Sequence, residues 1–452
     1  MVFDEVTRRD ILGKIGFAAG ISTLGMGLGQ LSIAAEAYGG GAAGSLAAID
    51  QPWWEMGMME DEILEQVLIF YMGHTWQQLS DVGECLDTAS RVKRGEPWSW
   101  ANEWDATAKR LQALAEESES QGHTISAGEA YLRASNYYIA SMHRHPDPYH
   151  ESIERMTRAS VSCFSKGIKH LGLPVEEVEI PYEGTTLPGY FFRSPVADTK
   201  APTMIIFNGR DAWSIQDKVL AEAGNKRGYH VMLFDGPGQG QVMRLQGLPF
   251  RHDWEKVITP VVDYTLTMEG VDPERIGVMG LSMGGVLAPR AAAFEHRPKV
   301  YVANPGVVSW LDVVNVTIAP LVGGEEGLKL IDSDPAAFDK IMNDLIAQSS
   351  FLQWGMDDTY WKQGVKTPVE LMLELRKYDN TDVAANIRSK MLLMHGEADL
   401  WGQVDELKKM SGGPTDIVRF GGDYAGQLHC QTGAWSILNH KLYNWLDENL
   451  KV

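Results

Sequence analysis

Cysteine is scarce in this chain, and the three that occur are far apart. Cys85, Cys163 and Cys430 are spread over 452 residues and form no CxxC or CxxH pair. A disulfide framework and a structural zinc site both rest on closely and regularly spaced ligands. The sequence therefore argues against both, and it leaves open a single disulfide.

Basic residues and long apolar runs are also few. The chain has 40 Lys and Arg against 60 Asp and Glu, which gives a formal net charge of −20. An acidic surface repels polyanions, so nucleic acid and anionic membranes are not expected as partners. A weakly apolar stretch near the N-terminus is interrupted by Lys14 and by several glycines, so it does not predict a permanent membrane anchor.

The first 37 residues have the order of an export signal. Residues 7–14 (TRRDILGK) resemble the twin-arginine signature, a soft apolar run follows, and residues 35–37 (AEA) fit a cleavage site. We therefore predict a signal peptide over residues 1–37 and export by the twin-arginine route, to the periplasm or outside the cell. The alternative is a cytoplasmic protein whose N-terminal helix happens to carry two arginines. Residues 38–52 are small and flexible, and they predict a linker.

Two kinds of pattern divide the rest of the chain, which is too long for one ordinary core. Residues 53–173 have helical periodicity and predict a helical cap domain. Residues 174–452 begin with two strands around Gly184 and continue with alternating strands and helices. This alternation is typical of an α/β fold with a doubly wound, mostly parallel sheet. The stretch at about 307–385 interrupts it and predicts a helical insertion.

A serine between glycines follows one of the predicted strands. Residues 276–285 read IGVMGLSMGG, which places Ser282 between Gly280 and Gly284. In a strand–turn–helix of this kind the glycines allow close packing, while the serine is strained and its hydroxyl projects above the sheet. The motif alone also arises by chance, so an ordinary strand-to-turn junction is the alternative.

An acid and a histidine follow in the order that a nucleophilic serine requires. Asp399 follows the predicted strand 390–396, and His429 follows the predicted strand 416–422. Serine is a weak nucleophile until a base takes its proton, and the imidazole needs a carboxylate to fix its tautomer. The three positions together predict a catalytic triad of Ser282, His429 and Asp399.

Other titratable residues fit these roles less well. Glu397 is the alternative acid, whereas His395 and His440 fit packing or surface roles. The three histidines within residues 143–150 are separated by prolines, so a solvated loop is favoured over a metal site there.

Backbone N–H groups near the serine are expected to form an oxyanion hole. The first is that of Met283, directly after the nucleophile. The second should come from the loop after the predicted strand 203–209, where Arg210 is our choice. Residues 235–240 (DGPGQG) look like a phosphate loop but lack the Lys-Ser/Thr of a P-loop, so they predict a tight turn.

Together these motifs resemble a known family. DGPGQG, GLSMGG and LHCQTG, preceded by WSWANEW and AGEAYLRASNYY, are similar to the α/β-hydrolases grouped with 2,6-dihydroxypseudooxynicotine hydrolase and with fungal enzymes that shorten polyketide chains. The resemblance covers residues 55–450, approximately. It implies the α/β-hydrolase fold with a helical N-terminal cap, and it makes a homodimer plausible. The family's usual Gly-Leu-Asp-Ser is replaced by residues 209–212 (GRDA), which leaves the second oxyanion donor open.

The resemblance implies a serine hydrolase without metal or cofactor. Such enzymes cleave a C–C bond next to a carbonyl, often in an aromatic ketone, and some cleave esters. Trp104 and Tyr137 of the cap are candidates for contact with a small-molecule substrate, and their alternative role is helix packing. Two alternative functions stay open: a secreted carboxylesterase or thioesterase with the same triad, and a non-catalytic ligand-binding protein on a hydrolase scaffold.

Overall fold

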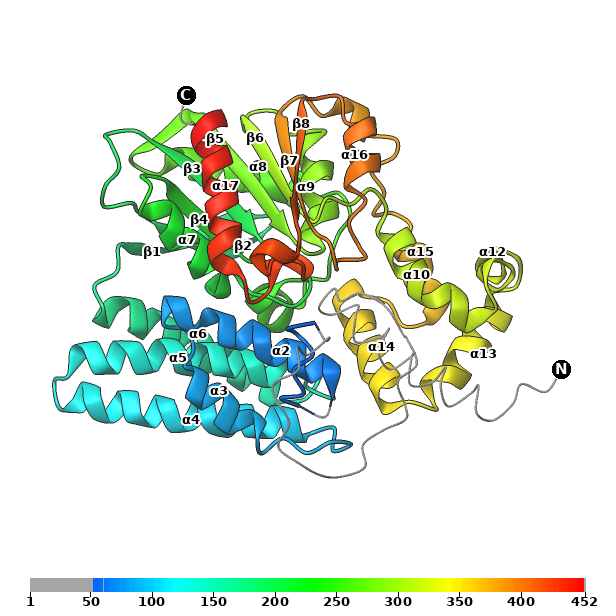
Figure 1. Cartoon of the computed structure of the whole chain (residues 1–452), viewed down its shortest axis with the longest axis horizontal. Helices are drawn as coiled ribbons and strands as arrows, with labels where there is room; N and C mark the ends of the chain where they lie inside the picture. Colours follow the sequence, from blue (N-terminus) through cyan, green and yellow to red (C-terminus); the bar gives the residue numbers. More distant parts are fainter. Residues whose placement is uncertain (1–51, 60, 451–452) are drawn as a thin grey trace.

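The computed structural model describes residues 52–59 and 61–450. The predicted signal peptide, residues 1–37, and all but the last residue of the predicted linker lie outside the described residues. The described chain forms a layer of helices, a sheet with helices on both faces, and a second set of helices inserted between two strands (Figure 1). None of the helices in this part of the chain is both long and apolar enough to span a membrane.

The central sheet has eight strands in the order β1-β2-β4-β3-β5-β6-β7-β8. β1 and β2 form an antiparallel hairpin at one edge, β2 pairs antiparallel with β4, and the remaining pairs are all parallel. Strands β3, β4 and β6 are buried along their whole length, which explains why they are continuous apolar runs in the sequence. The strands are β1 (Val175–Tyr182), β2 (Thr185–Phe192), β3 (Ala201–Phe207), β4 (His230–Phe234), β5 (Val271–Leu281), β6 (Val300–Asn304), β7 (Lys390–Gly396) and β8 (Thr415–Phe420).

Helices cover both faces of this sheet, as a doubly wound fold requires. They are α7 (Lys218–Asn225), α8 (Glu255–Thr267), α9 (Gly284–Ala292), α16 (Val404–Met410) and α17 (Trp435–Asn449). In Figure 1, α7 and α17 lie in front of the strands, whereas α8 and α9 lie behind them. The Tyr443 hydroxyl of α17 donates to the Leu220 carbonyl of α7 at 2.7 Å, which joins the two front helices.

The helices before the sheet form the cap layer. They are α2 (Glu62–Gly73), the short 3-10 helix η1 (His74–Gln77), α3 (Val82–Ala89), α4 (Ser99–Ser120), α5 (Thr124–His143) and α6 (Ser152–His170). α5 packs against both α4 and α6, and nearly all of its side chains from Ala127 onward are buried. Asn136 of α5 accepts a hydrogen bond at 2.9 Å from Gln216 of the sheet domain. A polar contact of this kind helps to fix how the cap sits on the sheet.

The inserted helices lie between β6 and β7, at the side of the molecule in Figure 1. They are α10 (Trp310–Val322), α11 (Glu325–Leu328), α12 (Leu330–Ser333), α13 (Pro335–Ile346), α14 (Ser350–Gln363) and α15 (Pro368–Leu375). α14 is joined to the loop after β3 by ion pairs of 2.8 Å (Arg210–Asp358) and 3.0 Å (Lys362–Asp211). Breaking one partner of a buried pair leaves an uncompensated charge, so these contacts fix α14 over that loop.

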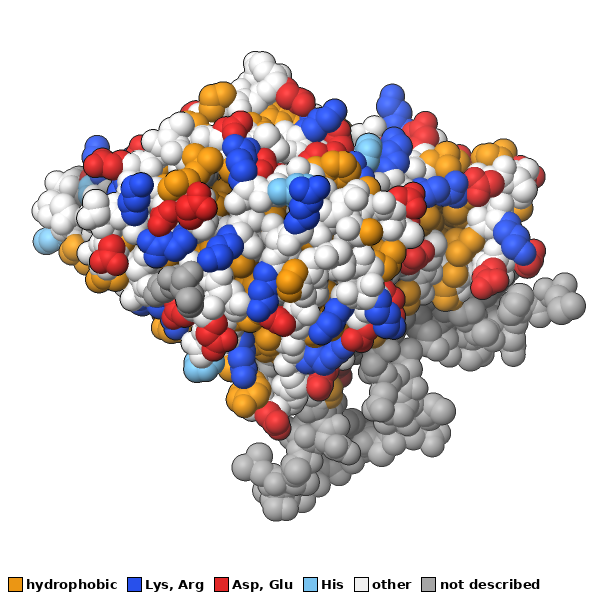
Figure 2. All heavy atoms as spheres, turned by 90° about the horizontal axis from the view of Figure 1, so that it is seen from above, with side chains coloured by type: hydrophobic (Ala, Val, Ile, Leu, Met, Phe, Trp, Pro, Cys, Tyr) orange, Lys and Arg blue, Asp and Glu red, His pale blue; other side chains and the backbone are white. Residues whose placement is uncertain are grey.

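The surface carries charges of both signs. Figure 2 shows Lys and Arg side chains interspersed with Asp and Glu over the face above the sheet, without a continuous basic area on that face.

The three cysteines are buried and carry free thiols. The single disulfide that the sequence left open is therefore not formed. Burial raises the pKa of the Cys85 and Cys163 thiols to about 12, so neither is a reactive nucleophile near neutral pH.

Candidate active site

Ser282 lies on the sharp turn between β5 and α9. Its φ of 58° is in the left-handed region, which residues with a side chain rarely adopt. A Cβ on Gly280 would lie 2.2 Å from the Gly284 carbonyl oxygen, so strand and helix approach this closely only because the site lacks a side chain. The strained strand–turn–helix that the sequence predicts is therefore present at this serine.

His429 and Asp399 form a buried pair beside that turn. His429 Nδ1 lies 2.8 Å from Asp399 Oδ2, and Asp399 Oδ1 accepts the Trp401 N–H at 3.1 Å. The Trp401 and His429 rings are in contact, with centroids 4.9 Å apart. Because a carboxylate accepts at Nδ1, that nitrogen carries the proton and Nε2 is the basic one. Within the described chain, Nε2 has no hydrogen-bond partner.

One pocket of about 540 Å³ between cap and sheet holds both the serine and the histidine. Ser282 and His429 line it, and Asp399 lies behind His429. The structure therefore brings together three predicted residues that come from the ends of β5 and β7 and from the loop after β8. The alternative acid, Glu397, has an exposed side chain. Neither His395 nor His440 lines this pocket.

The residues after His429 anchor it to the serine turn. The Cys430 thiol donates to the Asn304 carbonyl at 3.1 Å and accepts the Ser282 N–H at 3.2 Å. Gln431 Oε1 accepts a hydrogen bond from Asn304 Nδ2 at 2.9 Å. Cys430 and Gln431 both have a positive φ, of 50° and 53°. In the sequence, HCQ served only as a family motif, and its role in positioning the histidine loop was missed.

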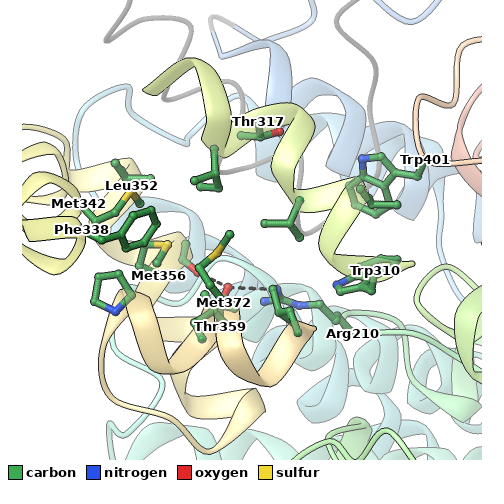
Figure 3. Close-up of a pocket in the computed structure, with 17 residues that line it drawn as sticks. Arg210, Trp310, Thr317, Phe338, Met342, Leu352, Met356, Thr359, Met372 and Trp401 are labelled. Carbon is green, nitrogen blue, oxygen red and sulfur yellow. Dashed lines mark hydrogen bonds between the residues drawn. The ribbon is translucent and has the colours of Figure 1, made fainter. Parts of the chain in front are cut away.

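The loop after β3 presents Gly209 to the serine. A Cβ at Gly209 would lie 2.5 Å from the Met283 nitrogen and 2.9 Å from Ser282 Oγ. The Arg210 side chain turns away into a second, apolar pocket of about 730 Å³ in the insertion, where it donates to Thr359 at 3.0 Å (Figure 3). The group that Arg210 can offer to an oxyanion hole is therefore its backbone N–H.

The DGPGQG segment supports this loop instead of binding phosphate. The buried Asp235 carboxylate accepts the backbone N–H groups of Ser214, at 2.8 Å, and Gln241, at 3.1 Å. The Gln239 side chain donates to the carbonyl of Asn208 in the loop after β3. The tight structural turn that the sequence predicts is confirmed.

Trp104 and Tyr137 lie elsewhere. Both are fully buried inside the cap with their ring centroids 5.2 Å apart, and neither lines the serine pocket. Both side chains therefore have the alternative role of helix packing, because α5 is covered on both sides by other cap helices. The cap residues that do line the pocket are Phe70, His74 and His143.

His143 differs most from its prediction. The sequence favours a solvated loop for this segment, but α5 extends through His143, which is only 8% exposed, and His145 in the loop that follows is buried as well. The sequence feature that could have placed His143 in a buried helix is the apolar pattern of α5, which continues as far as Met142. No group of three or more His, Cys, Asp or Glu side chains that could hold a metal occurs in the described part of the chain.

The His429–Asp399 pair predicts how activity depends on pH. Burial lowers the pKa of His429, but the Asp399 carboxylate outweighs burial and raises this pKa well above 6.5. Only the neutral imidazole can take a proton, so activity should fall as pH drops through the raised pKa. We expect the acid limb of the kcat/KM profile above pH 6.5. A limb below that value would contradict the pairing.

The close approach of Gly209 predicts a sensitive position. In Gly209→Ala the new methyl would press on the Met283 nitrogen, so the expected loss in kcat is about 10²-fold or more, as for loss of an oxyanion donor. Steady-state kinetics would measure it. Gly422→Ala is a matched control, because its Cβ would meet nothing closer than the Gln427 side chain at 3.4 Å. Equal activity of both variants would contradict this placement.

Known proteins resemble this chain along most of its length. A family profile described as the alpha/beta hydrolase family matches residues 188–429. Hydrolase LUC6 from a Fusarium species is 33% identical over 395 residues, which are 82% of this chain and 93% of that protein. The 20-hydroxy-prefusarin hydrolase FUS2 from Gibberella moniliformis is 31% identical over 401 residues, which are 83% and 93% of the two chains.

Solved structures show the same fold. The 2,6-dihydroxy-pseudo-oxynicotine hydrolase superposes with a TM-score of 0.62 at 19% identity, over 84% of this chain and 95% of that one. AbyA5 superposes with a TM-score of 0.55 at 16% identity, over 86% and 94%. At these identities the likeness concerns the fold alone, and the fold class predicted from the sequence is confirmed.

Proposed function

Because this chain belongs to the alpha/beta hydrolase family, as its motifs predict, we propose that it is a serine hydrolase acting on a carbonyl group of a small molecule. One observation carries the proposal. The strained Ser282 lines the same pocket as His429, whose Nε2 is unpaired and whose Nδ1 is held by the buried Asp399. A nucleophile, a base and an acid that orients the base are the parts of a catalytic triad, and one pocket holding the first two supports the proposal.

The first half of the proposed reaction forms an acyl-enzyme. Ser282 Oγ attacks the carbonyl carbon while His429 Nε2 takes its proton, and Asp399 stabilises the imidazolium. Backbone N–H groups of Met283 and of the loop after β3, with Arg210 as our choice, stabilise the oxyanion. The bond to the leaving group then breaks, its electron pair leaves with that group, and His429 returns the proton.

The second half releases the acid. Water, deprotonated by His429, attacks the acyl carbon and frees Ser282 together with a carboxylic acid. Every proton transfer in the cycle involves His429. The overall reaction is the addition of water across one bond, so it needs no external oxidant or reductant.

We propose that the bond cleaved is a C–C bond next to a carbonyl, or an ester bond. Two observations support an aromatic or ketone-type substrate. The pocket walls include Phe70, Trp435 and the rings of three histidines, whose flat faces suit a planar molecule. The names of FUS2 and of the structural neighbour specify 20-hydroxy-prefusarin and 2,6-dihydroxy-pseudo-oxynicotine as what those proteins hydrolyse.

A substrate panel tests this proposal against its rivals. The purified full chain is incubated with p-nitrophenyl esters, acyl thioesters and aryl 1,3-diketones, and the products are identified by mass spectrometry. Cleavage of a diketone to an acid and a ketone, at a higher kcat/KM than any ester, supports the C–C reaction. Faster turnover of esters or thioesters favours the esterase alternative. No turnover, with tight binding by calorimetry, favours a ligand-binding protein.

We also propose that the protein is exported by the twin-arginine route. The support is the order of residues 7–14, the apolar run and residues 35–37. The test compares the native chain with the double variant Arg8→Lys and Arg9→Lys in cell fractions. Loss of the exported form in the variant supports the proposal, and identical fractionation contradicts it.

A further inference from the structure

His143 lines the serine pocket and has an unpaired ring nitrogen. It reaches the pocket from the end of α5, and it lines the wall together with Ser282 and His429. His143 Nε2 is buried, and the described residues give it no hydrogen-bond partner. Buried polar atoms are nearly always satisfied by protein, water or ligand, so an unpaired one at a pocket wall can take its partner from a bound ligand.

The tautomer of His143 follows from Tyr71. The Tyr71 hydroxyl lies 3.0 Å from His143 Nδ1. Burial raises the pKa of Tyr71 well above its usual value, so the phenol keeps its proton. A phenol that keeps its proton can donate to Nδ1. We assign it as that donor, which places the single proton of the neutral imidazole on Nε2.

His143 is neutral at physiological pH. Burial lowers its pKa to about 4; Asp211 and Asp358 oppose this decrease, whereas Lys362 and Arg144 add to it. A neutral imidazole can donate a hydrogen bond to developing negative charge without exchanging protons with the catalytic base. His143 and His429 thus offer the pocket two different functions: a fixed donor and a base.

The other cap histidine in the pocket cannot replace it. His74 Nδ1 lies 2.7 Å from the Phe70 carbonyl oxygen, which only accepts, so Nδ1 carries the proton of His74. Its Nε2 is then an acceptor. Among the cap residues that line the pocket, His143 is thus the imidazole that can donate.

We propose that His143 Nε2–H donates a hydrogen bond to the leaving group's carbonyl oxygen, and that this contact selects 1,3-dicarbonyl substrates. This inference rests on the proposed function. When the C–C bond breaks, its electron pair moves into the leaving group and forms an enolate, whose oxygen accepts from His143. The proton that His429 took from Ser282 then returns to the enolate carbon and gives a ketone. An ester leaves as an alkoxide that His429 protonates directly, so His143 is not needed there.

The proposal predicts a substrate-dependent defect. His143→Phe keeps a ring but removes the donor, so kcat for an aryl 1,3-diketone should fall by about 10²- to 10³-fold, while p-nitrophenyl ester turnover changes by less than about fivefold. His143→Gln restores an N–H and should recover part of the diketone activity. His145→Gln is the matched control, because His145 is equally buried but has both nitrogens bonded and lies outside the pocket. An equal loss on both substrates, or no loss, would overturn the proposal.

A binding measurement separates this inference from the proposed function. In the Ser282→Ala background, calorimetry measures the Kd of 1-phenyl-1,3-butanedione with and without His143→Phe. The expected result is a weakening of about tenfold or more, since the oxygen loses its donor. An unchanged Kd, or no binding in either protein, overturns the role of His143. His143-dependent binding in a protein that cleaves neither substrate would reject the proposed function alone.

Discussion

Ser282→Ala is expected to lower kcat by about 10⁵- to 10⁶-fold, the loss that removal of a nucleophilic serine causes when its base and acid remain. The same variant should no longer react with a fluorophosphonate. Mass spectrometry of the wild type should show one adduct, on the peptide that contains Ser282, and the variant should show none. The reason is local: Ser282 lines the pocket beside His429, whose Nε2 is free to activate it.

Ser135→Ala provides the control for this result. Ser135 is a buried cap serine that is hydrogen-bonded to Ser160 at 3.1 Å, so its loss should leave the labelling unchanged. The turn itself should persist in Ser282→Ala, because the backbone N–H of residue 282 still donates to Asn304 at 2.7 Å. A folded wild type that gains no adduct, or gains it on another serine, would show that the proposed nucleophile is misassigned.

The serine, acid and histidine could be found in the sequence because of how parallel strands are arranged. The carboxyl ends of parallel strands meet at one edge of a sheet, so residues just after β5, β7 and β8 become neighbours wherever they lie in the chain. The short apolar strands β3 and β6 were also readable, because these two strands are buried on both faces. Order along the chain was therefore enough to predict which side chains share the edge.

The cap side of the pocket could not be found in this way. Periodicity shows which face of a helix is buried, but not what covers it. Trp104 and Tyr137 are buried against other cap helices, whereas His143 is buried against the serine pocket. That difference depends on how the cap sits on the sheet, which rests on tertiary contacts such as the one between Gln216 and Asn136.

In the insertion, the sequence likewise does not show which charged residues pair with one another. Its helical character was readable, but the partners of Arg210 and Asp211 are Asp358 and Lys362, about 150 residues away in the chain. No local pattern links such distant charges. Their pairing holds α14 over the loop after β3 and turns the Arg210 side chain into the apolar pocket of the insertion, whereas Asn208, Asp211 and Ala212 of the same loop line the serine pocket.

Asp399→Asn is the second substitution with a large expected effect. We expect kcat to fall by about 10⁴-fold, because an amide can donate to Nδ1 and hold the imidazole in the tautomer that cannot act as a base at Nε2. The raised pKa of His429 should also fall, since the Asp399 carboxylate is the largest of the contributions, Cys430 among them, that raise it against burial. The acid limb of the residual activity should therefore move to lower pH, and steady-state kinetics over a pH series would measure both changes.

Glu397→Gln is the matched control, and it decides between the two acids that the sequence offered. Glu397 is two residues away in the same loop, but its side chain is exposed, whereas Asp399 is buried against His429 Nδ1 at 2.8 Å. An exposed carboxylate is screened by water and contributes little to the imidazole, so Glu397→Gln should keep its kcat within about twofold and leave the acid limb in place. If instead the loss and the pH shift followed Glu397, the acid of the proposed triad would have to be reassigned, and the loop after β7 would need a different arrangement in the working enzyme.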